Sequence, residues 1–240
     1  MPINAPSITR WIGIGLLGLP LYGALTLWST LDSQPDPATR YDAWSRFVTT
    51  DHYLIAHLFG SIGGAVFAIL GAFALGAYLA TSRAGRMGLA AMVTTVVGQA
   101  LGLTVGGVST FAAPEEGQAH LAGIEAYARL NEQQPMLADT ALMATFALAI
   151  LLMFVGSVLL GVAVWRSGIL PRWAGALWTT SGLVFYVLGA VLGMATTGGA
   201  LVTQPVASVL MVVSGAWMAF SVLRRPSARA VGVGAQPSVQ

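Results

Sequence analysis

Residues 53–80 read YLIAHLFGSIGGAVFAILGAFALGAYLA, and this stretch decides the fold class. It carries no Asp, Glu, Lys or Arg over 28 residues, whereas about 20 apolar residues already cross a hydrocarbon core of about 30 Å. Small residues recur in it at every fourth position, which aligns them on one face of a helix. The stretch therefore predicts a transmembrane helix that packs closely against other helices.

Five further apolar stretches have the length of a membrane span. With the first, they lie at residues 11–31, 53–80, 87–112, 140–165, 173–195 and 205–223. Only 8% of the residues are charged, against about 25% in an ordinary soluble domain. The sequence predicts an all-α integral membrane protein, a six-transmembrane-helix bundle that forms a single domain over residues 1–225. Residues 226–240 lack hydrophobic periodicity, and we expect them to be a disordered cytoplasmic tail.

The charged residues divide between the two sides of this arrangement. One side holds eight arginines and no acidic residue: Arg10, Arg83, Arg86, Arg166, Arg172, Arg224, Arg225 and Arg229. The other side holds three arginines and all nine acidic residues. The positive-inside rule places the arginine-rich side, with both termini, in the cytoplasm. All eleven basic residues are arginine, which is typical of a GC-rich bacterial genome, so we expect a multi-pass protein of the bacterial cytoplasmic (inner) membrane.

Each of the two long outer loops shows the pattern of a short amphipathic helix. Apolar residues recur at helical spacing after a proline in both loops: Tyr41, Trp44 and Phe47 or Val48 after Pro37, and Leu121, Ile124 and Ala128 after Pro114. We expect both helices to lie flat among the lipid headgroups, with Tyr41 and Trp44 as anchors. The alternative is that they cover an outward-facing cavity.

Two spans carry glycines at a spacing that favours close helix packing. These helix-packing candidates are Gly60, Gly64 and Gly76 in the second span, and Gly98, Gly102 and Gly106 in the third. In lipid, small residues let helix backbones approach and gain dispersion contacts and weak hydrogen bonds. We interpret the glycines as packing positions, with a glycine-lined permeation path as the alternative.

Few polar side chains lie inside the spans. Gln99 is near the middle of the third span and Tyr186 near the middle of the fifth, and each could join helices or line a binding cavity. No Asp, Glu, Lys or Arg lies in the central part of any span, which disfavours ion-driven transport.

His57 is the ionisable side chain inside a span, with Ser61 one turn deeper. Both are candidate ligand-binding residues, since a histidine there could hold haem or a metal, bind a quinone or relay a proton. The alternative is a histidine whose nitrogens bond to neighbouring protein groups. A second haem ligand would have to be His52 or His120, and neither is well placed. We predict no cofactor, and haem at His57 is the minor alternative.

Motifs for catalysis are absent from the sequence. It has no Gly-rich phosphate loop, nucleophile elbow, paired-carboxylate site or metalloprotease helix. It also has no cysteine, which removes disulfides, thiolate nucleophiles and iron–sulfur clusters. We therefore expect no catalytic residue and no metal site, and an enzyme is not favoured. The net charge of +2 disfavours nucleic acid as a partner.

The inner loop after the fourth span carries the one resemblance to known families. Residues 167–175 read SGILPRWAG, which resembles the S-G-x-L-P-R-W-x-G inner loop of uncharacterised bacterial multi-pass membrane protein families. The resemblance implies a bacterial architecture of six or seven spans and no particular activity.

The leading hypothesis is a membrane protein that acts by binding. It would be an accessory or structural subunit of a membrane assembly, or a binder of a small apolar ligand, with the lipid bilayer, other membrane subunits or a second copy as partners. One alternative is a carrier for a small neutral or amphipathic solute. The other is a membrane redox protein or enzyme that uses His57.

Overall fold

The computed structural model describes residues 5–32, 34–124, 137–193 and 202–224, and all regular secondary structure in them is helical. Six helices are long and apolar enough to cross a membrane: Ile8–Ser29, Asp51–Ala80, Gly85–Leu121, Thr140–Ser167, Arg172–Leu192 and Thr203–Leu223. The prediction of six spans is confirmed, and the chain is a multi-pass membrane protein. The predicted tail at residues 226–240 lies outside the described residues.

The first span consists of two helices, α1 (Ala5–Leu16) and α2 (Gly18–Ser29), which meet at Leu17. Pro20 explains the position of the break, because proline has no N–H to bond the carbonyl four residues earlier, that of Leu16. Gly18 brings α2 against α5, since a Cβ added there would lie 2.6 Å from the Phe67 carbonyl oxygen.

The second and fifth spans each contain a π-helical segment. The second span runs without a break through α4 (Asp51–Ile55), η1 (Ala56–Gly63) and α5 (Gly64–Ala80), and the fifth through α9 (Arg172–Gly182) and η2 (Leu183–Leu192). A π-helix bonds each N–H to the carbonyl five residues earlier, so its side chains turn around the axis relative to an α-helix. The π segments therefore change which side chains face the interior of the bundle.

The remaining spans are single helices: α6 (Gly85–Leu121), α8 (Leu137–Ser167) and α11 (Thr203–Leu223). The prediction that a separate outer helix begins at Pro114 is wrong, because α6 continues through Pro114 to Leu121. Packing explains the continuation, since a Cβ added at Gly117 would lie 2.9 Å from the Ser45 carbonyl oxygen of the neighbouring loop helix. The predicted helix extended to Ala128, which lies outside the described residues.

That loop helix is α3 (Tyr41–Val48), in the first long loop. Trp44 is only 7% exposed and forms a small hydrophobic cluster with Val48 and Tyr53. The expectation that Trp44 anchors α3 among the headgroups is therefore wrong, because the indole packs inward. The Tyr41 hydroxyl donates a hydrogen bond to Glu116 Oε1 at 2.7 Å, and burial together with this bond raises the pKa of Tyr41. These contacts fasten α3 to the end of α6.

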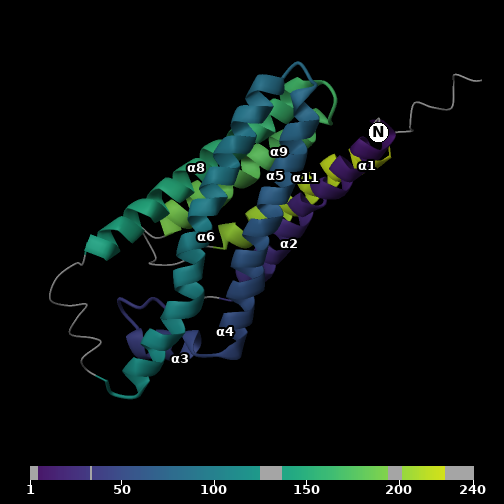
Figure 1. Ribbon diagram of the computed structural model, residues 1–240. Coiled ribbons are helices and arrows are strands. Elements are labelled where there is room, and N and C mark those ends of the chain that lie inside the picture. Colours follow the sequence, from purple (N-terminus) through teal and green to yellow (C-terminus); the bar gives the residue numbers. More distant parts are fainter. Residues whose placement is uncertain (1–4, 33, 125–136, 194–201, 225–240) are drawn as a thin grey trace, which may run out of the picture.

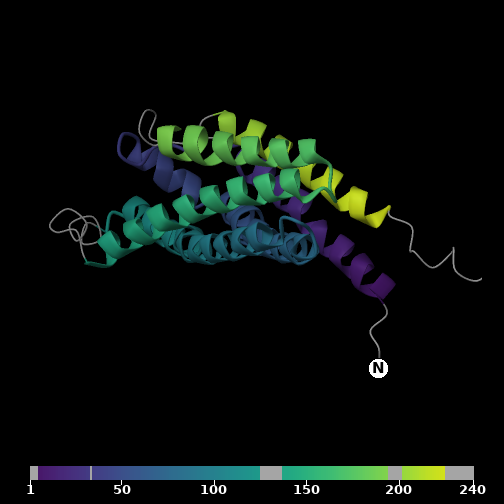
Figure 2. The ribbon, with the colours of Figure 1, turned by 90° about the horizontal axis from the view of Figure 1, so that it is seen from above.

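The six spans close into a ring. Each span packs against the spans before and after it in sequence, and α11 of the last span packs against α1 and α2 of the first. Seen from above in Figure 2, α9 and η2 lie on one side of the bundle and α5 and α6 on the other. The main hydrophobic core lies inside this ring and draws residues from all six spans.

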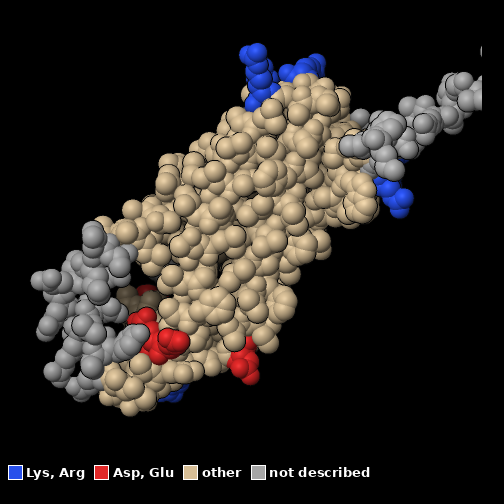
Figure 3. All heavy atoms as spheres, in the orientation of Figure 1, with Lys and Arg blue, Asp and Glu red and all other residues tan. Residues whose placement is uncertain are grey.

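The two ends of the ring carry different charges (Figure 3). Arg83, Arg86 and Arg166 lie at one end, called here the arginine end. Asp32, Asp42 and the other described acidic residues lie at the opposite end, called here the acidic end. The sides of α5, α6 and α8 between these ends present large apolar residues, as a lipid-facing surface requires.

Candidate functional site

Three polar side chains from three spans meet inside the ring. Tyr22 of α2, Gln99 of α6 and Tyr186 of η2 are 8%, 4% and 3% exposed. The two tyrosine hydroxyls lie 3.1 Å apart and share a hydrogen bond, and the Gln99 side chain lies close to both hydroxyls. The Thr26 side chain reaches the Tyr22 hydroxyl from the next turn of α2. We call these four residues the central cluster.

The central cluster lies deep in the membrane part of the bundle. Tyr22, Gln99 and Tyr186 each follow the first residue of their span by 14 positions (22 − 8, 99 − 85 and 186 − 172). At 1.5 Å per residue this places each about 20 Å from the arginine end of its span. The three side chains therefore share one level near the middle of a hydrocarbon core of about 30 Å.

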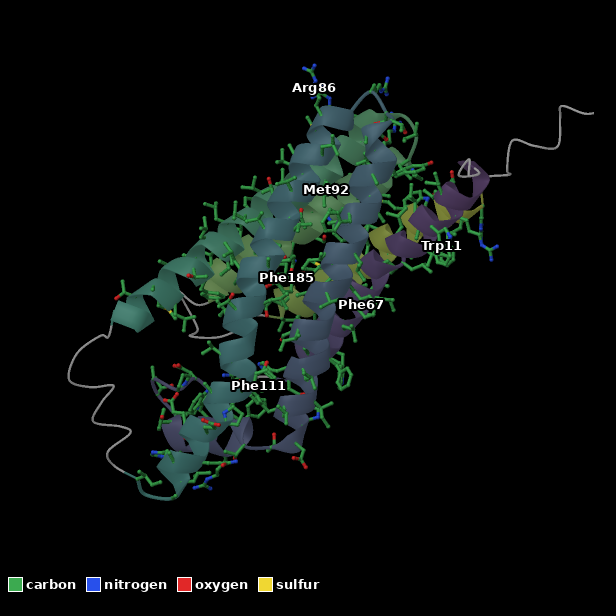
Figure 4. The ribbon with its side chains drawn as sticks, in the orientation of Figure 1. Trp11, Phe67, Arg86, Met92, Phe111 and Phe185 are labelled. Atoms are coloured by element: carbon green, nitrogen blue, oxygen red, sulfur yellow. The ribbon has the colours of Figure 1, made fainter. Side chains whose placement is uncertain are left out.

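The position of each side chain in the cluster follows from the ring. The first, third and fifth spans alternate around it, so a long side chain from each can reach the axis. Gly64 of α5 lies beside the cluster, and a Cβ added there would be at ordinary contact distance, 3.6 Å from Tyr22 Cδ2 and 3.7 Å from Thr26 Oγ1. The Phe185 ring packs edge-on against Tyr186 with centroids 5.1 Å apart, and Figure 4 shows Phe185 in the middle of the bundle.

The chemistry of the central cluster is that of uncharged hydrogen bonding. Each hydroxyl can donate one hydrogen bond and accept others, and the Gln99 amide offers two N–H donors and a carbonyl acceptor. Such a set suits a hydroxyl, carbonyl or amide of a ligand. It supplies no metal ligand of the usual kinds, and the described part of the chain contains no group of three or more His, Cys, Asp or Glu that could hold a metal.

His57 belongs to a different layer, nearer the acidic end. Its ring lies against the Tyr53 ring with centroids 3.9 Å apart, and its Nδ1 donates to the Tyr53 carbonyl oxygen at 3.0 Å. It precedes Gly64, which borders the central cluster, by about two helical turns. Ser61 lies between these levels and is partly buried. The structure thus brings Gln99 and Tyr186 together and leaves His57 outside their cluster.

The other two histidines are paired with carboxylates at the acidic end. His52 Nε2 lies 2.5 Å from Asp32 Oδ2, and His120 Nε2 lies 2.6 Å from Asp42 Oδ1. The hydrogen bond and the charge of His120 lower the pKa of Asp42, with a smaller contribution from the Arg46 charge. Both imidazoles lie at the acidic end, outside the central cluster.

The six candidate packing glycines lie at different kinds of contact. Gly60 packs against Ser29 of α2. A Cβ added at Gly76 would lie 2.6 Å from Met92 Cβ, and one added at Gly98 would lie 2.8 Å from the Met153 backbone nitrogen. Figure 4 places Met92 in the upper half of the bundle, where α5 and α6 lie side by side. Clearance then increases along α6. The atom nearest to an added Cβ is Met153 Cε at 3.5 Å for Gly102, and Ile62 Cγ1 at 4.0 Å for Gly106.

Sequence reasoning did not select Tyr22 and Thr26. The signal for Tyr22 was present, because a tyrosine in the middle of the first span is the same feature that identified Tyr186 in the fifth. Thr26 follows Tyr22 by four residues, which places both on one face of α2. The sequence does not show which face of each span turns toward the axis of the ring, so the meeting of the three spans needed the structure.

Comparisons with protein-family models, with curated proteins and with solved structures find no match for the chain. A function for this membrane protein therefore has to be argued from the central cluster and its surroundings.

Proposed function

We propose that this membrane protein acts by binding a small, largely apolar ligand that carries one uncharged polar group. The observation that supports the proposal is the convergence of Tyr22, Gln99 and Tyr186 from three alternating spans on one point of the ring axis. Ligand sites in membrane helix bundles are built in this way, from a few polar groups in apolar surroundings.

The composition of the central cluster supports an uncharged polar group on the ligand. A charged ligand would need a compensating charge at this depth, where an unpaired ion is costly. Hydroxyls and an amide instead satisfy a group that can donate or accept a hydrogen bond. Gln99 alone has two donors and an acceptor, so it can bond a ligand while it keeps a tyrosine partner.

The clearance between the glycines of α6 and the neighbouring helices supports a route by which a ligand reaches the central cluster. Gly98 is in tight contact with the α8 backbone, whereas Gly102 and Gly106, one and two turns nearer the acidic end, meet only the tips of side chains. Side-chain tips can move at low cost, while a backbone cannot. We therefore place the entry of the ligand along the glycine face of α6, on the side of the acidic end.

A second candidate, a carrier for a small neutral or amphipathic solute, is favoured by the π-helical segments. Tyr186 lies within η2, and η1 ends at Gly63, beside the residue that borders the central cluster. π-helical segments are rare and are frequently found at functional sites. A local change from π to α hydrogen bonding would rotate Tyr186 relative to Gln99 and could release a bound solute.

The test of the proposal is chemical analysis of what stays bound after purification. The protein is purified in mild detergent from its native membrane, washed and extracted with organic solvent, and the extract is analysed by liquid chromatography and mass spectrometry. Tyr186→Phe removes one cluster hydroxyl and keeps the ring. Thr94→Val is the matched control, because the Thr94 hydroxyl bonds only to the Ala90 carbonyl of its own helix, at 2.9 Å.

We expect about one non-phospholipid molecule per protein in the wild type and in Thr94→Val. The amount bound should be at least fivefold lower in Tyr186→Phe. Equal amounts in all three proteins would place the molecule elsewhere and contradict the proposal. A stoichiometric protein partner without a small molecule would instead support an accessory or structural subunit, in which the central cluster only joins helices.

A further inference from the structure

An open pocket of about 420 Å³ lies at the arginine end, away from the central cluster. It is formed where α5 ends, where α6 begins and where α8 ends. Three arginines line it, Arg83, Arg86 and Arg166, together with Ser82 and Gly85. Figure 4 shows Arg86 at this end of the bundle.

The charge in this pocket is not balanced by the protein. None of the nine acidic residues lies between Asp51 and Glu115 or after Asp139 in the sequence. The described residues that line the pocket include no carboxylate. The first turn of α6, which starts at Gly85, adds the positive end of a helix dipole. The pocket therefore favours an anion from outside the chain.

Arg83 is exposed, but contacts with the end of α8 hold its side chain in place. Its Nε donates to the Arg166 carbonyl oxygen at 2.6 Å, which ties the turn after α5 to the end of α8. Its guanidinium also lies over Gly168, where an added Cβ would be 3.1 Å from Nη2. Gly168 has a φ of 71°, a conformation that glycine adopts without strain. A guanidinium fixed in this way keeps a planar fork that suits phosphate oxygens.

The level of the pocket is that of lipid headgroups. Trp165 directly precedes Arg166 and is 41% exposed, and Trp173 is 58% exposed. Their rings pack edge to face at 5.2 Å, and the Arg172 guanidinium lies over both, at 5.9 Å and 5.7 Å. Exposed tryptophans beside arginine mark the membrane–water interface.

We propose that this pocket binds the phosphate of an anionic phospholipid headgroup, with Arg83, Arg86 and Arg166 as its ligands. A soluble phosphate would meet the same chemistry, but the interface residues place the pocket where lipid phosphates are already concentrated. The site is independent of the central cluster and of the ligand proposed there.

The test uses the full-length protein in a zwitterionic detergent with phosphatidylglycerol as the probe and phosphatidylcholine as background lipid. Native mass spectrometry counts the phosphatidylglycerol that stays bound. Arg83→Gln and Arg86→Gln remove charge from the pocket, and Arg83→Lys keeps the charge without the planar fork. Arg224→Gln is the matched control, because it removes the same charge from the end of α11, outside the pocket. A sixth sample adds inorganic phosphate to the wild type at constant ionic strength.

We expect Arg83→Gln and Arg86→Gln each to weaken phosphatidylglycerol binding about fivefold, the effect of one basic residue at an anionic surface. Arg83→Lys should weaken it less, and Arg224→Gln and inorganic phosphate should leave it unchanged. Arg86 is exposed, so its variant keeps the test valid even if Arg83→Gln fails to fold. An equal loss of phosphatidylglycerol binding in Arg224→Gln would show that only the net charge of the protein matters. Displacement of the lipid by inorganic phosphate would assign the pocket to a soluble anion. Either result overturns the proposal.

Discussion

Replacement of Gly98 by alanine tests the packing of α6 on α8, which holds Gln99 in position. A Cβ at Gly98 would lie 2.8 Å from the Met153 backbone nitrogen and 3.0 Å from the Leu152 carbonyl carbon. An ordinary contact needs about 3.5 Å, so the two helices would have to separate by about 0.7 Å. Both nearby atoms belong to a helix backbone, so no side-chain rotation can relieve the contact.

The expected cost follows from two opposing effects. Overpacking a close contact costs about 1–3 kcal/mol, while alanine favours a helix over glycine by about 0.5–1 kcal/mol. We therefore expect Gly98→Ala to lower the free energy of unfolding by about 1–2 kcal/mol. Gly102→Ala is the matched control on the next turn, where the nearest atom is the end of the Met153 side chain at 3.5 Å. That variant should be unchanged or up to about 1 kcal/mol more stable.

Equilibrium unfolding by sodium dodecyl sulfate in mixed micelles, followed by circular dichroism, measures both variants against the wild type. Wild-type stability in Gly98→Ala would show that α6 and α8 are not in backbone contact at this level. A larger loss in Gly102→Ala than in Gly98→Ala would also refute the reasoning, because it would reverse the order of clearance along α6.

Three further predictions concern other parts of the chain. His57→Gln should leave the melting temperature within about 1 °C and the protein without haem absorption, and a Soret band that the substitution removes would restore the redox hypothesis. Since the pKa of Asp42 is lowered in the fold, its pairing with His120 stabilises the protein fully above about pH 4, and this stabilisation is lost as the pH falls through the lowered pKa. A thiol at buried Ser45 (Ser45→Cys) should then react faster with 4,4′-dithiodipyridine in acid, relative to a thiol at exposed Thr81 (Thr81→Cys). A ratio of the two reaction rates that does not change with pH would contradict this. In intact cells, an impermeant maleimide should label Gln118→Cys at the acidic end and not Thr81→Cys at the arginine end, because the positive-inside rule puts the arginine end in the cytoplasm; the reverse pattern would invert the topology.

The six spans could be predicted from the sequence because each is a long apolar run, and length alone decides whether a helix can cross a bilayer. The outer ends of the spans depend on tertiary contacts instead. Pro114 and the residues after it carry the local signals of a new helix, yet contact between Gly117 and α3 extends α6 past them. Trp44 is of the residue type that anchors helices at the membrane interface, yet the packing of α3 on α6 places it beside Val48 and Tyr53.

The central cluster could be predicted only in part. Gln99 and Tyr186 are conspicuous as polar groups in apolar runs, and so is Tyr22. Whether they meet depends on the rotation of each helix about its axis, and the π-helical bonding of η2 changes that rotation for Tyr186. His57 is equally conspicuous, but its Nδ1 bonds within its own helix, a partner that residue type alone does not reveal.

Ligand binding at the central cluster is tested by whether a native ligand stabilises the protein through that cluster. Wild type and Tyr186→Phe are stripped of bound small molecules by extensive detergent exchange, and melting temperatures are then recorded with and without the organic extract of the native membrane. A ligand at about 100 times its Kd adds about 2.7 kcal/mol, which corresponds to a rise of about 5–10 °C in the wild type. We expect that rise in the wild type and none in Tyr186→Phe. An equal rise in both proteins, or none in either, would contradict it.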